Sequence, residues 1–269
     1  MPIITKITVQ KKKTDRYNIY MDYGKGEEYA FSVDEDVLIK HQLKKGLELD
    51  EFALSEIGYK DDIRKAYNTA IQYLSRRMRS ETEVRKHLAE KEVEEPVIQE
   101  VIHKLYDYKF LNDEEFAKAF VRTQMNTSDK GKGLIRNELR EKGISSKLIE
   151  EALEEYPMEI ELDTAIKLCG KQAQKLSRDS SKIIKQKLEQ MLMRKGFNFE
   201  IIQAAIAETE LEKEEDEEMA ALKFQAEKAK RKYVKLPKFE YKQKMKQTLF
   251  RKGFSFDLIA QYLNEEEDI

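Results

Sequence analysis

The sequence contains few of the residues that build disulfides, break helices or cross membranes. Its 269 residues include one cysteine, Cys169, no tryptophan, four prolines and ten glycines. A single cysteine excludes an internal disulfide and any metal site built from several cysteines. No apolar run approaches membrane-spanning length, and the N-terminus lacks the apolar segment of a signal peptide. We therefore expect a cytoplasmic protein that does not enter a membrane.

Signatures of catalysis are also missing from the sequence. His41, His87 and His103 are scattered, with no carboxylate or cysteine at ligand spacing. No phosphate-binding loop, glycine-rich nucleotide fingerprint or nucleophile elbow occurs. Cys169 lies in an apolar helix stripe, which favours a buried core thiol over a nucleophile. We predict that the protein is not an enzyme and that it has no catalytic residue, no metal site and no cofactor.

What the sequence does contain is a short motif that recurs four times. The copies are LAEKEV at 88–93, LREKGI at 139–144, LMRKGF at 192–197 and LFRKGF at 249–254. Counted from Glu92, Gly143, Gly196 and Gly253, the intervals are 51, 53 and 57 residues. Apolar residues eight and four before this position share one helix face, and those six and ten after it share another. The glycine suits the end of a helix, where a positive φ is needed. The pattern predicts tandem three-helix units.

Residues 2–33 follow a different pattern from the rest of the chain. Three runs with β-branched or alternating apolar residues are separated by polar turns at 11–15 and 24–26. This arrangement predicts a small antiparallel meander, which needs a cover on its apolar face. We expect that cover to be a short helix near 35–41 and a second near 50–57. The module is a stabilising cap or, alternatively, a docking site for a partner.

These patterns together predict a mainly helical protein, an elongated curved array of three-helix repeats with an N-terminal β-meander. The first helical unit begins near Asp61. The predicted divisions are 1–60 for the N-terminal module and 61–110, 111–156, 157–209 and 210–269 for four helical repeats. No exposed heptad seam is visible, so we expect a monomer.

Three segments of the first two repeats resemble the RecX family. They are YLSRRMRSETEV at 73–84, FLNDEEFA at 110–117 and GLIRNELREKGI at 133–144. Their order and spacing are similar to those of RecX proteins, and the specific resemblance covers about residues 62–156. The weaker repeats and the N-terminal strands look like the long form found in Gram-positive bacteria. None of the motifs is catalytic.

The resemblance implies a regulator of the RecA recombinase. RecX proteins bind along the groove of the filament that RecA forms on single-stranded DNA, and they promote its disassembly or block its growth. RecA ATP hydrolysis and strand exchange then fall, and some members also bind DNA directly. This chain departs from shorter members by its strand module and its fourth repeat.

Charge is segregated along a chain whose net charge is only -2. Residues 221–253 carry twelve Lys and Arg against Glu227 and Glu240, and residues 171–195 carry eight against Asp179 and Glu189. Acidic runs occupy 208–218 and 265–268. The basic stretches predict either salt-sensitive contact with DNA phosphates or ordinary solvated faces neutralised by the acidic runs.

Arginine clusters in the first two repeats are the sharpest local signals. Arg76, Arg77 and Arg79 stand at a helix end. One interpretation is that Arg77 and Arg79 interact with the helix dipole or pair with Glu81 and Glu83, and the other is that the cluster contacts phosphate or an acidic RecA surface. Arg136 and Arg140 are four residues apart, so they share a helix face. The candidate RecA- or DNA-binding residues are Arg76, Arg77, Arg79, Arg85, Arg136, Arg140, Lys142, Lys182, Lys185, Arg194, Lys230, Arg231, Lys242, Lys246 and Arg251.

Two functions remain open at this point. The first is a non-catalytic modulator, mostly an inhibitor, of the RecA filament on single-stranded DNA. The second is a helical-repeat scaffold or nucleic-acid-binding protein without RecA specificity. They differ in whether any effect on RecA exceeds simple competition for DNA.

Overall fold

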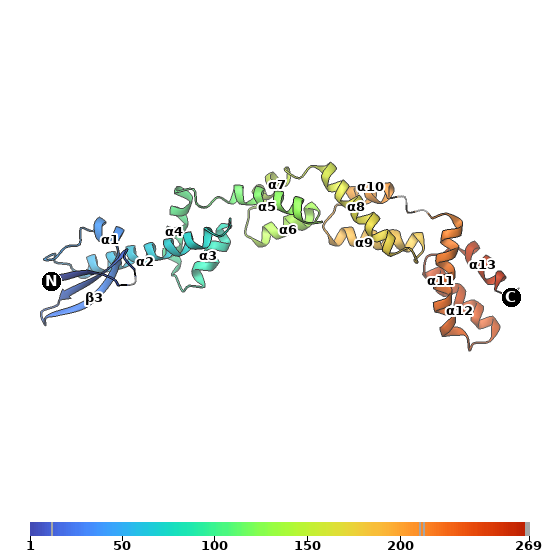
Figure 1. Cartoon of the computed structure of the whole chain (residues 1–269), viewed down its shortest axis with the longest axis horizontal. Helices are drawn as coiled ribbons and strands as arrows, with labels where there is room; N and C mark the ends of the chain where they lie inside the picture. The colour runs from blue at the N-terminus through green and yellow to red at the C-terminus, as the bar shows by residue number, and fades with distance from the viewer. Residues whose placement is uncertain (12, 210, 212, 267–269) are drawn as a thin grey trace. The chain divides into compact units, whose positions relative to one another are not determined.

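The computed structural model describes residues 1–11, 13–209, 211 and 213–266. Within them the chain contains three strands followed by thirteen helices (Figure 1). This confirms the prediction of a mainly helical chain with an N-terminal antiparallel sheet. The chain forms two compact units, one of Met1–Phe116 with Lys142–Ile144 and one of Ala117–Glu141 with Ser145–Ile269.

The N-terminal module is a three-stranded meander with helices on one face. Strands β1 (Ile3–Val9), β2 (Arg16–Asp22) and β3 (Glu27–Asp34) pair antiparallel in that order. Helix α1 (Glu35–Lys40) follows, capped by the Asp34 side chain, which accepts from the backbone N–H of Asp36. Ile4, Ile19 and Met21 on the sheet are fully buried against residues of α1 and of the following helix. The predicted strands and first short helix are confirmed.

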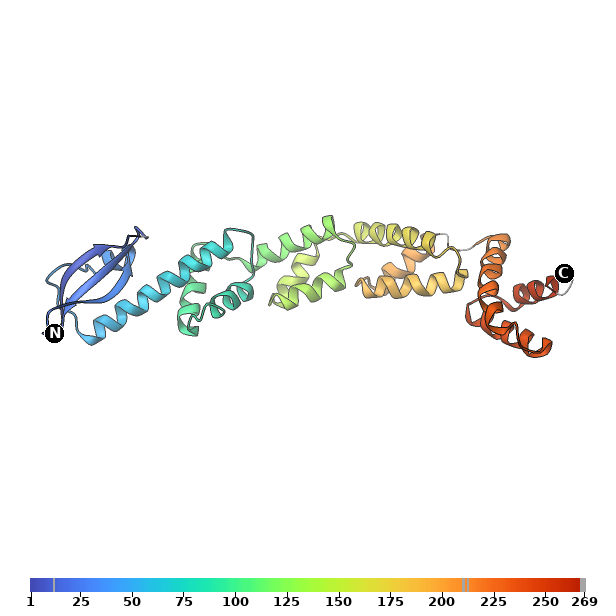
Figure 2. The ribbon, with the colours of Figure 1, turned by 60° about the horizontal axis from the view of Figure 1, so that its bottom comes forward.

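The second short helix predicted near 50–57 is wrong as a separate element. Helix α2 runs without interruption from Glu51 to Leu74 and continues from the sheet into the first repeat (Figure 2). Asp50 caps it by accepting from the N–H of Ala53 at 2.7 Å. No proline follows within the helix, and Gly58 has open space around it, so nothing stops propagation. The predicted boundary between residues 60 and 61 therefore falls inside α2.

A buried ion pair ties the sheet to α2. The guanidinium of Arg16 on β2 donates to both carboxylate oxygens of Asp61 at 3.2 and 2.8 Å. Asp61 also accepts from the backbone N–H of Asp34 at 2.8 Å, and Lys65 lies 2.9 Å away. Burial opposes ionisation of Asp61, but the hydrogen bonds from Arg16 and Lys65 outweigh it and hold its pKa below the usual value.

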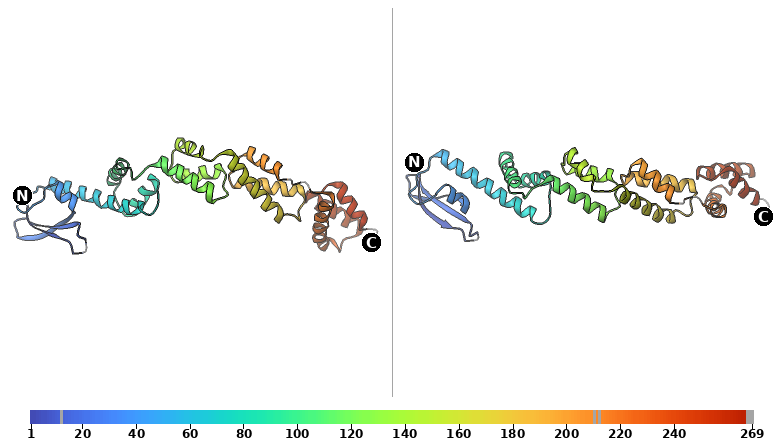
Figure 3. Two further views of the ribbon diagram at one scale, coloured as in Figure 1. Left: turned by 45° about the horizontal axis from the view of Figure 1, so that its top comes forward. Right: turned by 90° about the horizontal axis from the view of Figure 1, so that it is seen from above.

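The remaining helices form four successive three-helix repeats. Repeat 1 consists of α2, α3 (Glu81–Ala89) and α4 (Glu95–Asp107). Repeat 2 consists of α5 (Asp113–Thr127), α6 (Lys132–Glu141) and α7 (Ser146–Leu153). Repeat 3 consists of α8 (Met158–Lys175), α9 (Ser181–Arg194) and α10 (Phe199–Glu208), with α10 packed against α8 (Figure 3). Repeat 4 consists of α11 (Glu215–Tyr233), α12 (Lys238–Arg251) and α13 (Phe256–Glu265). The residue boundaries between the repeats stay a prediction.

The predicted core positions of the middle helices are buried in all four repeats. The residues four before the turn position are Leu88, Leu139, Leu192 and Leu249, and each is 0% exposed. The residues eight before it are Val84, Ile135, Leu188 and Met245, and these too are 0% exposed. Ser145, Asn198 and Ser255 cap the third helices of repeats 2, 3 and 4, and Ser80 and Glu83 form a capping box at the start of α3.

The turn between the second and third helices has a positive φ in all four repeats, with a glycine at this position in three of them. Gly143, Gly196 and Gly253 have φ of 79°, 84° and 88°. Glu92 adopts φ of 60° at the same place in repeat 1. The left-handed geometry thus persists in repeat 1 without a glycine, at some cost in backbone strain.

The turn also contacts the preceding repeat, and we call this contact between neighbouring repeats the joint. It occurs three times. The carbonyl before each glycine accepts a hydrogen bond at the N-terminus of the preceding repeat's middle helix. Ser80 Oγ donates to Lys142 at 2.8 Å, Ser180 Oγ donates to Lys252 at 2.6 Å, and the Gly131 N–H donates to Lys195 at 2.9 Å. From the sequence we assigned the glycine a role only within its own repeat, so this contact was not predicted.

An acidic side chain completes each joint. The backbone N–H of Glu81 donates to Asp113 at 2.8 Å, that of Lys132 donates to Glu161 at 2.8 Å, and that of Ser181 donates to Glu218 at 3.2 Å. In each case the carboxylate comes from the start of the next repeat's first helix. It caps N–H groups that the middle helix cannot satisfy itself.

Candidate functional site

A groove at the joint of repeats 2 and 3 collects three of the predicted cations. We call it the joint groove, and its volume is about 620 Å³. Arg136 and Arg140 of α6 and Arg194 of α9 line it. Lys132, which was not among the predicted cations, lines it as well. The groove brings together side chains from positions 132 to 194 because the two repeats meet there.

Two arginines of the joint groove remain exposed. Arg140 and Arg194 are exposed, and their nearest polar partners are the Asn137 side chain at 3.5 Å and the Gln190 carbonyl at 3.2 Å. Arg136 instead makes a two-pronged ion pair with Glu150 at 2.8 and 2.9 Å, which raises the pKa of Arg136. The groove therefore offers exposed guanidinium groups to an anionic partner.

One carboxylate lies within the joint groove. Glu161 is 2% exposed, and burial raises its pKa, although the Lys132 N–H and the charges of Lys132 and Arg136 oppose the rise. It accepts from the backbone of α6, so it supports the joint between the repeats.

The arginines of repeat 1 are mostly engaged within the repeat. Arg77 pairs with Glu83 at 2.8 Å, which favours the structural interpretation of this residue. Arg79 lies 4.1 Å from the centre of the Tyr73 ring and 3.9 Å from Glu83. Arg85 pairs with Glu81 and Glu95, and Lys142 lies 3.3 Å from Glu83. Arg76 is exposed and has no ion-pair partner among the described residues.

Repeats 3 and 4 carry several candidates that lack partners. Lys182, Lys185, Arg231, Lys246 and Arg251 are exposed and form no ion pair with any other residue that the structure describes. Lys230 pairs with Glu266 at 2.8 Å, and Lys242 lines a pocket of about 470 Å³ beside it. The acidic runs that could neutralise the basic stretches are described only in part, because residues 210, 212 and 267–269 lie outside the described residues.

An exposed aromatic pair includes a residue of the helix that carries two of these cations. The rings of Phe250 and Phe256 stack with centroids 4.3 Å apart and stay 47% and 63% exposed. Lys246 and Arg251 lie on the same helix as Phe250, four residues before it and one after it. This pair was not among the predicted site residues. The sequence does hold a signal for it. Phe250 and Phe256 lie three residues before and three residues after Gly253, and these positions do not belong to the predicted buried faces of the two helices.

The described part of the chain offers neither a metal cluster nor a membrane-spanning helix. It contains no group of three His, Cys, Asp or Glu side chains that could hold a metal ion. Nor does any of its helices combine the length and apolar character needed to span a bilayer. Cys169 is fully buried, as predicted, and burial raises the pKa of its thiol.

The fold and surface define a class, a tandem array of three-helix repeats with exposed cations and an N-terminal antiparallel sheet. Family models of RecX domains match almost all of it. The regulatory protein RecX N-terminal domain matches residues 2–50, and the first and second three-helix domains match 66–105 and 112–153. The third three-helix domain matches twice, at 159–206 and 215–263. The chain belongs to the RecX family.

Full-length relatives agree with these matches. The chain is 51% identical to the regulatory protein RecX of Bacillus velezensis over 267 residues, which cover 99% of this chain and 100% of the relative. It is 50% identical to that of Bacillus subtilis with the same coverage. A crystal structure of a regulatory protein RecX superposes with a TM-score of 0.67 at 37% identity, covering 76% of this chain and 98% of the other. A crystal structure of RecX from Lactobacillus salivarius gives 0.55 at 39% identity, covering 57% and 99%.

Proposed function

We propose that this protein restrains the RecA recombinase by binding its filament on single-stranded DNA. Binding lowers filament growth, ATP hydrolysis and strand exchange, with DNA contacted directly or through RecA. The relatives' name, regulatory protein, supports a regulatory role without catalysis, and the motif resemblance points to RecA. The protein acts as a monomer and needs no cofactor.

The joint groove is the observation in this chain that carries the proposal. Arg140 and Arg194 come from neighbouring repeats, and both are exposed in its lining. Planar guanidinium groups bind carboxylates and phosphates in two-pronged fashion. An acidic surface of the filament, or its DNA backbone, fits such a groove.

The primary test is ATP hydrolysis by RecA on single-stranded DNA, with this protein titrated far below the RecA concentration. We expect hydrolysis to fall when too little protein is present to cover the DNA, because the protein acts on the filament itself. Loss of hydrolysis only near DNA-saturating levels would point to competition for DNA. No effect at any level would contradict the proposal.

Charge-matched variants test the groove in the same assay. Arg140→Gln/Arg194→Gln should raise the concentration needed for half-inhibition by about tenfold, the factor that a lost charged contact typically produces. The control is Lys147→Gln/Lys167→Gln, which removes two exposed cations that each pair with a carboxylate on their own helix. An equal effect of both double variants would show that net charge, not the groove, matters.

The aromatic pair favours a second candidate, direct binding of single-stranded nucleic acid without RecA specificity. Bases stack on exposed aromatic rings, and flanking cations follow the phosphates. Anisotropy of a labelled oligothymidylate, measured without RecA, tests it. Phe250→Ala/Phe256→Ala should weaken binding several-fold if bases stack there, and unchanged affinity would rule the pair out.

A further inference from the structure

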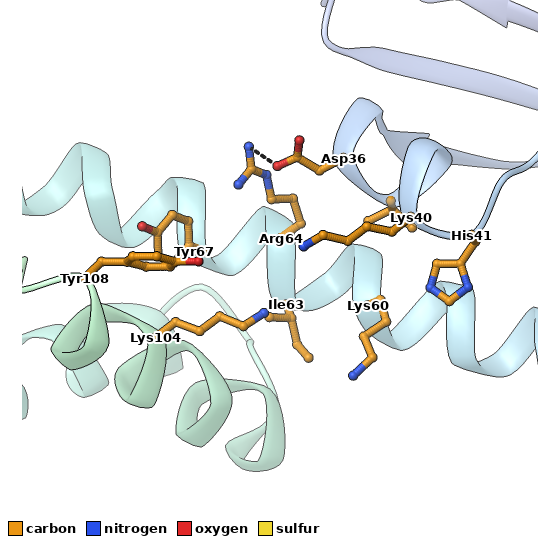
Figure 4. Close-up of a pocket in the computed structure, with 10 residues that line it drawn as sticks. Asp36, Lys40, His41, Lys60, Ile63, Arg64, Tyr67, Lys104 and Tyr108 are labelled. Atoms are coloured by element: carbon orange, nitrogen blue, oxygen red, sulfur yellow. Dashed lines mark ion pairs between the residues drawn. The ribbon is translucent and has the colours of Figure 1, made fainter.

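A second cationic pocket lies in the N-terminal part of the chain, between α1, α2 and α4. It has a volume of about 370 Å³ and opens at the surface. Figure 4 shows Lys40 of α1 and Lys104 of α4 extending into this space from opposite sides, Lys40 above Ile63 and Lys104 beside it. The cationic residues in its lining are Lys40, Lys60, Arg64 and Lys104.

The pocket holds more positive charge than its own carboxylates neutralise. Asp36 is the acidic residue in its lining, and it pairs with Arg64 at 2.8 Å. Arg64 also pairs with Asp34 at 3.2 Å. Lys40, Lys60 and Lys104 form no ion pair with any described residue. Lys40 and Lys60 are exposed and Lys104 is half-buried, so the pocket lining offers an incoming anion three ammonium groups that have no ion-pair partner.

Burial and the neighbouring cations both lower the pKa of Lys104. Burial lowers its pKa, and the charges of Lys40, Lys60 and Arg64 lower it further, while Glu100 on the same helix opposes the change. An isolated surface lysine has no such neighbours. The group is thus poised to gain from a bound anion.

The walls of the pocket suit a ligand with a flat, apolar part beside its charge. Ile63, which is 1% exposed, contributes an apolar side chain to the lining. The rings of Tyr67 and Tyr108 meet edge to face with centroids 6.3 Å apart, and Tyr108 is 65% exposed. Figure 4 shows both rings at the end of the pocket near Lys104.

We propose that this pocket binds a nucleotide phosphate, with the phosphate between Lys40 and Lys104 and the base against Tyr108. The same chemistry is offered by a single strand's backbone and by free nucleotides or polyphosphates. The proposal is independent of any action on RecA, because the pocket shares no residue with the joint groove. It gives the N-terminal module a binding role in addition to that of a stabilising cap.

The test uses the full chain at low salt and two probes. Calorimetry measures binding of pyrophosphate, and anisotropy measures binding of a labelled five-residue oligothymidylate. Lys40→Met/Lys104→Met keeps the apolar stems of both side chains and removes two pocket charges. The control, Lys44→Met/Lys86→Met, removes two exposed charges from the same part of the chain outside the pocket. We expect the pocket variant to lose about tenfold or more in affinity and the control to change little.

The two probes separate the possible sources of the phosphate. If pyrophosphate and the oligonucleotide both bind, and the pocket variant weakens the binding of each, the ligand of the pocket is a nucleic-acid strand. Tyr108→Ala should then weaken the binding of the oligonucleotide only. Binding of pyrophosphate alone assigns a free anion. Pyrophosphate should also raise the melting temperature of the wild type but not of the pocket variant. Binding of neither probe, or equal losses in both double variants, would overturn the proposal.

Discussion

Gly131 illustrates how close the backbones come at the joint of repeats 2 and 3. A Cβ at this position would lie 2.6 Å from the Phe197 nitrogen and 2.7 Å from the Gly196 carbonyl. These are backbone atoms, so relief requires the joint to open. We predict that Gly131→Ala lowers the free energy of unfolding by about 1–3 kcal/mol, the usual range for overpacking. Urea denaturation measures it.

Gly170 provides the matched control. It lies inside α8, and a Cβ added there would meet no atom within 4 Å outside its own helix. Gly170→Ala should stabilise by about 0.5–1 kcal/mol, because alanine restricts the unfolded chain and favours the helix. If the two substitutions had the same effect, close backbone approach would not be what holds the joint.

Glu161 gives the same joint a dependence on pH. Its folded pKa is raised by burial, so the folded state binds a proton more tightly than the unfolded chain does. The raised pKa of Glu161 stabilises the folded state fully at pH values below the pKa that Glu161 has in the unfolded chain. This stabilisation is lost as the pH rises through the pKa of Glu161 in the folded protein. Glu161→Gln keeps an acceptor for the Lys132 N–H without the charge. We predict that the melting temperature of Glu161→Gln rises relative to that of the wild type as the pH is raised from about 4 to about 8.

The control for Glu161 lies two residues away. Glu159 is exposed, and Glu159→Gln should leave the slope of melting temperature against pH unchanged. A wild-type curve parallel to that of Glu161→Gln across this interval would contradict the role assigned to the buried carboxylate.

At the scale of elements, some helix caps serve two helices. Ser180 accepts from the Ile183 N–H at 3.3 Å as the cap of α9 and donates to the Lys252 carbonyl at 2.6 Å in repeat 4. Ser145 caps α7 at 3.4 Å and is exposed. We predict that Ser180→Ala costs about 2 kcal/mol and Ser145→Ala about 1 kcal/mol, since only the first also loses a buried contact. Denaturation of the two variants compares them, and equal losses would contradict the double role.

The elements themselves were predictable because their signals are local. Caps such as Ser80 and core leucines such as Leu192 follow from spacing within one helix or turn. The joints were not predictable, because the serine at a cap does not indicate which distant carbonyl it will meet. The full length of α2 was not predicted. The segment that covers the sheet and the segment that begins repeat 1 have the same helical periodicity, so the sequence does not show that they form one helix.

The candidate site was predicted in part for the same reason. Spacing placed Arg136 and Arg140 on one helix face, but their meeting with Arg194 depends on the joint between repeats. Pairing decides which cations stay available, and the pairing of Arg85 with Glu95 and of Lys230 with Glu266 joins residues on different helices or their caps, which the sequence alone could not assign. The N-terminal pocket gave no signal, because Lys40, Lys60 and Lys104 come from three separate elements.

For the molecule as a whole, net charge is a poor guide to binding. The chain carries 50 Lys and Arg against 52 Asp and Glu. Many cations are consumed by ion pairs, so affinity for an anionic polymer depends on those that have no partner. Among the described residues, Lys182, Lys185, Lys246 and Arg251, all in repeats 3 and 4, belong to that group.

This distinction predicts how binding to single-stranded DNA responds to salt. Each cation that contacts a phosphate contributes roughly 0.7 to the slope of log affinity against log salt for single strands. Replacing Lys182, Lys185, Lys246 and Arg251 with glutamine should therefore flatten the slope measured by anisotropy over a salt series. Replacing Lys65, Lys147, Lys167 and Lys187, which are already paired with carboxylates, removes the same charge and should leave the slope nearly unchanged. Equal flattening by both sets would mean that the overall field of the protein, rather than its unpaired cations, attracts the DNA.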